Sequence, residues 1–255
     1  MGETHLNEND IIINPFVKES IDILHQALCN KKLVLFVGAG VDIDSGMPSW
    51  SNAIKQFSEH LAIDNDSDDY LRIPQYYFND RGKKEYVELC RKIFRYQEEL
   101  PINPLQKKIV NFNVNTIITT NYSNFIEREM DKRGYIYQTI CQDKDLAYAS
   151  HDKLILKMHG DFQHDNFVLK EDDYLHYSDN FRLMETYIKA LIATNVVLFI
   201  GYSFNDPDVK QLFIHKPHGP GTGYPVAEGN GRPDKRRTGF SIAVPRRDRL
   251  LPLSG

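Results

Sequence analysis

Four short apolar runs are the clearest structural signal along the chain. They cover residues 33–37, 114–118, 154–158 and 196–200 and are rich in β-branched side chains. Apolar residues at successive positions are typical of strands that helices cover on both faces, as in a parallel sheet. The pattern therefore predicts an α/β fold.

Amphipathic segments separate these runs. Their apolar residues recur at helical spacing and predict helices over residues 17–30, 50–61, 85–98, 123–133 and 180–194. The acidic stretch 64–69 predicts a loop. Strands that alternate with helices in this way favour a doubly wound parallel sheet flanked by helices.

Glycine or polar residues follow each apolar run at once. The four groups are Gly38-Ala39-Gly40, Thr119-Thr120-Asn121-Tyr122, His159-Gly160-Asp161 and Gly201-Tyr202-Ser203. The carboxyl ends of parallel strands share one edge of the sheet, where ligands bind in open α/β folds. We therefore expect the four groups to converge on one site. The alternative is that they are ordinary turns.

The first group suits a phosphate ligand. Gly38 and Gly40 allow close approach to the backbone, and we expect them to offer free N–H groups. The full G-x-G-x-x-G spacing is absent, because Gly46 comes six residues after Gly40. Taken without the other groups, this one slightly favours a tight strand-to-helix turn. We expect the nearby Asp42 either to bind ribose hydroxyls or to face solvent.

These groups, together with Gly46-Met47-Pro48-Ser49-Trp50, occur in an order and spacing that resemble the sirtuin-like family. The resemblance spans residues 30–213 and is strongest to the sirtuin-like NAD hydrolase domains of bacterial antiphage defence proteins. It implies a Rossmann-like sheet with a small helical insertion. It also implies that NAD lies across the carboxyl ends of the strands as the substrate.

The resemblance also assigns roles to residues. Gly38, Ala39 and Gly40 would face the pyrophosphate, and Gly201 and Ser203 would lie beside the adenosine half. Asn121 and His159 match the catalytic pair at the nicotinamide ribose. The other predicted NAD-binding residues are Asp42, Pro48, Thr119 and Tyr122.

The chemistry expected at this pair is cleavage of the nicotinamide–ribose bond to give nicotinamide and ADP-ribose. The reaction passes through an oxocarbenium-like state, so the protein must hold the ribose and present a nucleophile to the anomeric carbon. Asn121 would orient water or a ribose hydroxyl, and His159 would act as a general base or bind the ribose diol. The structural alternatives are a helix cap for Asn121 and a strand-end cap for His159.

Two residues depart from the family pattern. Ser123 stands where an aspartate commonly follows the Asn-Tyr pair, and Asp42 stands where the glycine loop often has serine. A carboxylate near a pyrophosphate repels it. These departures favour a second hypothesis, a module that binds NAD or ADP-ribose without turnover. A third hypothesis is an NAD-dependent protein deacylase.

Composition limits the partners. The 255 residues carry a net charge of -4, but residues 216–255 have 8 basic and 3 acidic residues, which leaves residues 1–215 at -9. An acidic body argues against an extended nucleic-acid surface. We assign residues 1–215 to the sirtuin-like domain. Residues 216–255 read as a Gly/Pro/Arg-rich tail that is disordered or non-native, or as a basic tail that contacts an acidic partner.

Cysteine usage and hydropathy complete the expectations. Cys29, Cys90 and Cys141 are too far apart in sequence for a disulfide framework or the four-cysteine zinc module of sirtuin deacylases, so we expect no metal. No apolar run reaches the length of a membrane span, and residues 1–20 do not resemble a signal peptide, which predicts a cytoplasmic protein. Because unregulated NAD hydrolysis would harm the cell, we expect a homo-oligomer, a regulatory protein partner, or both.

Overall fold

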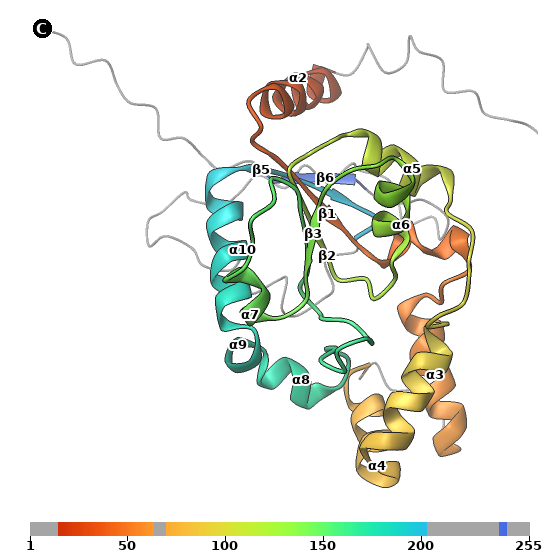
Figure 1. The fold of residues 1–255 in the computed structure, drawn as a ribbon. Helices are drawn as coiled ribbons and strands as arrows, with labels where there is room; N and C mark the ends of the chain where they lie inside the picture. Colours follow the sequence, from red (N-terminus) through yellow and green to blue (C-terminus); the bar gives the residue numbers. More distant parts are fainter. Residues whose placement is uncertain (1–14, 64–69, 203–239, 244–255) are drawn as a thin grey trace, which may run out of the picture.

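The computed structural model describes residues 15–63, 70–202 and 240–243. Its centre is a six-stranded sheet in the order β3-β4-β2-β1-β5-β6 (Figure 1). The strands are β1 (Leu33–Val37), β2 (Thr116–Thr119), β3 (Gln138–Ile140), β4 (Leu154–Lys157), β5 (Val196–Ile200) and β6 (Phe240–Ala243). β1 to β5 are mutually parallel, and β6 runs antiparallel to β5. The predicted α/β fold with a Rossmann-like parallel sheet is confirmed.

Helices connect the strands. They are α2 (Pro15–Cys29), α3 (Trp50–Leu61), α4 (Arg72–Ile93), α5 (Pro104–Asn111), α6 (Phe125–Lys132), α7 (Asp143–Leu146), α8 (Glu171–Leu175), α9 (Tyr177–Asn180) and α10 (Arg182–Thr194). Two 3₁₀ turns, η1 (Ala39–Val41) and η2 (Ile43–Ser45), follow β1. All five predicted helices are present, although the prediction over 85–98 found only the second half of α4, past a break at Gly82. The elements without a predicted counterpart are α5, the short helices α7, α8 and α9, and the strands β3 and β6.

Each face of the sheet is covered. Alternate side chains of one strand enter different cores: Val34 and Phe36 pack with Ile188 of α10, whereas Leu35 and Val37 pack with Ile109 of α5. This is the arrangement that continuous apolar strands require, because neither face meets solvent. The core therefore buries the central strands and leaves their carboxyl ends as the edge that is available for a site.

The segment between β1 and β2 contains a helical insertion. α3 and α4 pack against each other at one end of the sheet (Figure 1). Their core includes Phe57 and Tyr86, and it extends to Phe162 and Phe167 from the segment after β4. The small helical insertion expected from the resemblance is therefore present, and the segment after β4 links it to the sheet.

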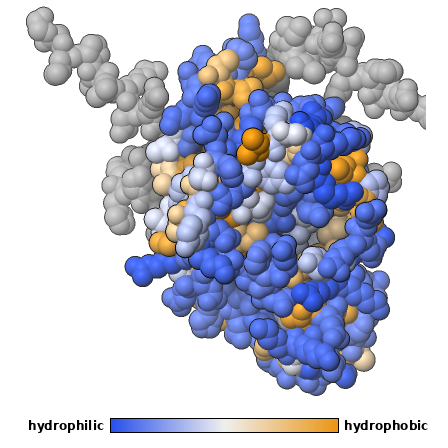
Figure 2. Space-filling model, viewed as in Figure 1, coloured by the Kyte–Doolittle hydropathy of each residue, from blue (hydrophilic) through white to orange (hydrophobic). Residues whose placement is uncertain are grey.

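The surface and the ends of the chain add two observations. Figure 2 shows mainly hydrophilic residues over the insertion and hydrophobic ones gathered near α2, where Ile21 is 50% exposed. Within the described ranges, no helix combines the length and the hydrophobicity that crossing a bilayer requires. β6 lies inside the segment predicted as a tail, and the rest of residues 216–255 lies outside the described residues, so the prediction for that segment stays open.

Candidate functional site

The carboxyl ends of β1, β2 and β5 meet through direct hydrogen bonds. The Asn121 side-chain Nδ2, just beyond β2, donates to the carbonyl oxygen of Gly38 at 3.1 Å. On the other side of β1, the N–H of Gly40 donates to the carbonyl oxygen of Gly201 at 2.9 Å. Three of the four predicted groups therefore lie against one another at one edge of the sheet.

His159 belongs to the same edge. β2 and β4 are neighbours in register, with Thr119 opposite Lys157, and Asn121 and His159 each lie two residues further along. His159 is buried, and its ring lies edge-on to those of Tyr174 and Tyr177 at centroid distances of 5.6 and 6.3 Å. The predicted catalytic pair thus occupies adjacent strand ends.

The glycine loop is shaped by its packing against β5. A Cβ atom on Gly40 would lie 2.8 Å from the carbonyl oxygen of Gly201, and one on Gly38 would lie 2.6 Å from the same oxygen. The N–H groups of Gly38 and Gly40 donate to Ile200 and Gly201. The expectation that these two N–H groups are free is therefore wrong, because the loop uses them to join β1 to β5. Ala39, which is exposed, remains the part of the loop open to a ligand.

Asp42 is a buried acceptor, with 4% of its surface exposed, so the expectation that it faces solvent is wrong. Its Oδ1 accepts a hydrogen bond from Gln106 Nε2 at 2.8 Å, and its Oδ2 accepts one from Asn121 Nδ2 at 2.9 Å. Ser123 Oγ donates to the same Oδ2 at 2.5 Å. The two departures from the family pattern are therefore hydrogen-bonded to each other.

Burial dominates the titration of this carboxyl. It raises the pKa of Asp42 from 3.8 to about 6, although the hydrogen bonds from Ser123, Gln106 and Asn121 act in the opposite direction. The carboxylate form is an acceptor only, and it matches the three donors that face it. Above about pH 6 the ionised side chain thus fixes the orientation of the Asn121 amide.

The orientation of Asn121 follows from its two acceptors. Nδ2 must face the Gly38 carbonyl and the Asp42 carboxylate, which leaves Oδ1 on the opposite side of the amide. Oδ1 is buried and has no hydrogen-bond partner among the described residues. A buried carbonyl oxygen without a donor is costly, so this atom is suited to accept a hydrogen bond from a bound hydroxyl group or water.

The remaining predicted residues play different parts. Thr119 Oγ1 donates to the carbonyl oxygen of Val37 and accepts from the N–H of Asn121, so it ties β2 to β1. The Tyr122 hydroxyl donates to Val168, and its ring packs in the insertion core. Pro48 is half-buried and precedes the cap of α3. Ser203 lies outside the described residues.

A buried network from α5 supports the site, and sequence reasoning missed it. Gln106, which holds Asp42, also accepts from Ser45 Oγ and from the N–H of Asn103. Asn103 Nδ2 donates to the carbonyl oxygen of Val41 at 2.7 Å. The signal was present in the sequence, since asparagine, proline and a glutamine three residues after the asparagine mark the start of a helix with a capping box. The network fixes the turn that carries Asp42.

Comparison with known proteins supports the resemblance. Residues 115–216 match the SIR2-like domain family. Defense-associated sirtuin 2 of Bacillus subtilis is 37% identical over 216 residues, which cover 81% of this chain and 21% of the relative. NAD(+) hydrolase ThsA of Cytobacillus dafuensis is 28% identical over 200 residues, 77% of this chain and 39% of the relative. ThsA of Bacillus cereus (strain MSX-D12) is 29% identical over 211 residues, 78% of this chain and 43% of the relative.

The chain thus spans about a fifth to two-fifths of the length of these relatives. The aligned part includes β2, β4 and β5, which carry Asn121, His159 and Gly201 at their carboxyl ends. The resemblance expected from the sequence is confirmed: this chain carries a sirtuin-like, SIR2-type domain.

Proposed function

We propose that this domain hydrolyses NAD, cleaving the bond between nicotinamide and ribose to give nicotinamide and ADP-ribose. The observation that carries the proposal is the buried Oδ1 of Asn121, an acceptor without a donor among the described residues, held in place by Asp42 and Gly38. The names of the ThsA relatives, which are NAD(+) hydrolases, agree with this chemistry.

Asn121 and His159 have different roles in the proposed reaction. Asn121 Oδ1 accepts a hydrogen bond from a ribose hydroxyl or from the attacking water, which holds the reacting groups in line. His159, two residues beyond β4, takes the proton of that water or binds the ribose diol. Water adds its oxygen to the anomeric carbon as neutral nicotinamide departs, and one proton is released. Ala39 would face the pyrophosphate, and Gly201 would lie by the adenosine half.

Water is the acceptor that the residues favour. Cys29 is exposed, Cys90 lies in the insertion core and Cys141 follows β3, so three separated cysteines cannot build the four-cysteine zinc module of the deacylases. Protein deacylation therefore ranks below hydrolysis. A sensor that binds NAD or ADP-ribose without turnover is the second candidate, because Asp42 adds a buried carboxyl close to the substrate groups.

The biological role proposed is antiphage defence by depletion of cellular NAD in the cytoplasm. The name of the Bacillus subtilis relative associates that protein with defence. Because NAD loss would harm the host cell, the proposal includes control by assembly of several copies or by a regulatory protein. Residues 1–215 carry a net charge of -9, so we do not expect them to bind nucleic acid directly.

The test is an assay of the purified chain with NAD, alone and at increasing protein concentration, in which chromatography separates nicotinamide, ADP-ribose and acetylated products. Hydrolysis lost in both Asn121→Ala and His159→Ala would support the proposal. Binding of NAD without turnover would instead favour the sensor, and an acetylated ADP-ribose formed with an acetylated peptide would favour the deacylase. An exposed histidine outside the site, His151, supplies the control variant His151→Gln.

A further inference from the structure

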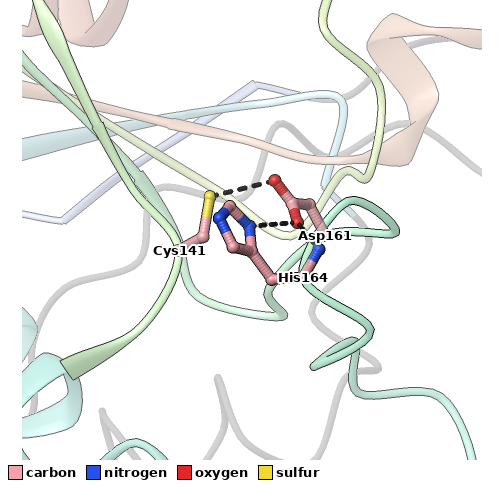
Figure 3. A group of neighbouring side chains, drawn as sticks. All are labelled: Cys141, Asp161 and His164. Atoms are coloured by element: carbon pink, nitrogen blue, oxygen red, sulfur yellow. Dashed lines mark hydrogen bonds and ion pairs between the residues drawn. The ribbon is translucent and has the colours of Figure 1, made fainter. Parts of the chain in front are cut away.

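A second group of reactive side chains lies beside the candidate site, at the carboxyl ends of β3 and β4. Cys141 follows β3, and Asp161 and His164 follow β4, so the group joins two neighbouring strand ends. Figure 3 shows the three side chains pointing toward one another. Cys141 Sγ donates to Asp161 Oδ2 at 3.2 Å, and His164 Nδ1 lies 2.7 Å from Asp161 Oδ1. The three ligand atoms lie within 4.8 Å of one another.

In contrast to the expectation of no metal, which rested on the cysteine spacing, we propose that Cys141, Asp161 and His164 form a site for a zinc-like divalent cation. Thiolate, imidazole and carboxylate are the ligands that Zn²⁺ takes in proteins, at bond lengths of about 2.0 to 2.3 Å. Two such ligands around a tetrahedral ion lie about 3.3 to 3.7 Å apart. The 3.2 Å between Cys141 and Asp161 is close to this range, and the 2.7 Å between His164 and Asp161 is shorter, so binding the ion requires the imidazole to move away from the carboxylate.

Neighbouring groups already orient the ligands. The N–H groups of Gln163 and His164 both donate to Asp161 Oδ1, which leaves Oδ2 for an ion. Asn166 connects the two strands, because its Nδ2 donates to the carbonyl oxygen of Cys141 at 2.7 Å and its Oδ1 accepts from the N–H of Asp161. Metal sites depend on such outer contacts to fix the first ligands.

The backbone is shaped around the same contact. Gly160 has a φ of +65°, and a Cβ atom there would lie 2.5 Å from the carbonyl oxygen of Asn166. Only glycine therefore lets this turn bring Asp161 and His164 close to Cys141. His164 is 37% exposed, whereas Cys141 is buried, so an ion would enter from the histidine side and keep a position open to solvent.

The charges around the group are compatible with a cation. Lys157 is the nearby positive group that acts on both Cys141 and Asp161, and it is paired with Glu127 at 2.9 Å. Burial raises the pKa of the Cys141 thiol, so without metal the sulfur keeps its proton. When the ion binds, the thiol proton leaves to solvent and the thiolate bonds to the ion. The imidazole binds the ion through Nδ1 and carries its ring proton on Nε2. A dication with one thiolate and one carboxylate is then neutral overall.

Cobalt supplies a spectroscopic test, because Co²⁺ replaces Zn²⁺ and reports its ligands. The full chain, stripped by a chelator, is titrated with Co²⁺. We expect one equivalent to bind, with a thiolate-to-cobalt charge-transfer band and the strong visible bands of a four-coordinate ion, both removed by added Zn²⁺. Cys141→Ser should remove the charge-transfer band, and His164→Gln should weaken binding by at least about tenfold.

Matched controls come from a second cysteine–histidine pair. On α2, Cys29 Sγ lies 3.8 Å from His25 Nε2, so Cys29→Ser tests whether that exposed pair binds the ion instead. We expect Cys29→Ser to bind as the wild type does. No stoichiometric binding by the wild type, or binding lost in Cys29→Ser but kept in Cys141→Ser and His164→Gln, would overturn the proposal. NAD hydrolysis is not the readout, so this result is independent of the proposed function.

A thermal measurement separates a bound ion from a hydrogen-bonded network alone. An ion that binds only the folded chain raises its melting temperature. Zn²⁺ should therefore raise the melting temperature of the wild type and of Cys29→Ser, and leave that of His164→Gln nearly unchanged. Equal shifts in all three proteins would contradict a site at Cys141, Asp161 and His164.

Discussion

At the residue scale, the two departures from the sirtuin-like pattern are in contact with each other. Asp42 stands where the family often has serine, and Ser123 stands where it commonly has aspartate. In the fold their side chains are hydrogen-bonded at 2.5 Å. In this chain the carboxyl therefore lies in the turn after the glycine loop and the hydroxyl lies in the segment after β2, and the two groups contact each other. Both residues contribute to the support of Asn121, because Ser123 donates to the Asp42 oxygen that accepts from the Asn121 amide.

Exchanging the two residues tests this interpretation. Asp42→Ser removes the carboxylate that holds Asn121, and Ser123→Asp places a second carboxylate against Asp42, so each single change should lower NAD hydrolysis by about 100-fold through misplacement of the amide. The double variant restores one carboxyl and one hydroxyl. Its rate, measured by nicotinamide release, should exceed that of either single variant by at least about tenfold. Additive losses would show that the pair does not act as a unit.

The buried carboxyl also makes stability depend on pH. Its pKa of about 6 in the folded chain lies above the ordinary 3.8, so its contribution to stability is fully present below about pH 4 and is lost as pH rises through about 6. We expect a loss of about 2 kcal/mol between about pH 4.5 and about pH 7.5. Urea unfolding of the wild type and of Asp42→Asn measures it.

Asp42→Asn is the reference because its amide does not titrate in this range. The free energy of unfolding of the wild type minus that of the variant should therefore fall as pH rises. A difference that stays constant, or that grows with pH, would contradict the raised pKa of Asp42.

At the element scale, the start of α5 supports the site. Asn103 caps the helix, and its Nδ2 also donates to Val41 and Ser45 in the turn that carries Asp42. Asn103→Ala should lower the free energy of unfolding by about 2 to 3 kcal/mol, since it removes a cap and leaves buried groups without partners. Urea denaturation measures this loss.

The cap of α3 provides the matched control. Among the described residues, the half-buried Ser49 side chain accepts from the N–H of Asn52 alone, so Ser49→Ala should cost about 1 kcal/mol. If the two variants lose the same stability, the contacts of Asn103 with the turn contribute nothing.

The junction of β1 and β5 makes a second test at this scale. Gly201 has a φ of +66°, and a Cβ atom there would lie 2.7 Å from Val41. Gly134 has a φ of +71° with nothing within 4 Å of such an atom. Gly134→Ala should therefore cost about 1 kcal/mol for backbone strain alone, whereas Gly201→Ala should cost about 3 kcal/mol and disturb the edge of the sheet. Thermal unfolding compares them, and similar losses would contradict the close packing.

The sequence predicted those elements whose signal is local and strong. β1 and β5 are five-residue runs buried along almost their whole length, and both were predicted at their observed bounds. β3 has three residues, of which only Ile140 is buried, and it therefore carries too little apolar pattern. α5 has eight residues and few apolar positions, so periodicity did not predict it, although its start carries a capping box.

Part of the candidate site could be predicted from the sequence, and part depends on contacts between distant residues. The places of Asn121 and His159 follow from strand order, because both residues come directly after parallel strands. The burial of Asp42 does not follow, since it depends on Gln106, 64 positions away, and on Ser123, 81 positions away. The N–H groups of Gly38 and Gly40 donate hydrogen bonds to the end of β5. The sequence around the glycine loop does not predict this partner.

At the scale of the whole molecule, the fold brings distant segments to one edge. β2 and β5 flank β1 on opposite sides, so the order of the strands reverses at β1, and open α/β sheets bind their ligands at such a point. The helical insertion and the segment after β4 share a core beside this edge. NAD bound there would contact parts of the chain that are more than 150 residues apart, between Ala39 and Gly201.

The most direct test is a crystal structure of the His159→Ala variant with NAD bound. We expect NAD across the carboxyl ends of β1, β2, β4 and β5, with a hydroxyl of the nicotinamide ribose, or a water beside it, donating to Asn121 Oδ1. NAD bound elsewhere on the molecule, or an Asn121 amide turned away from Asp42 and the ribose, would contradict it.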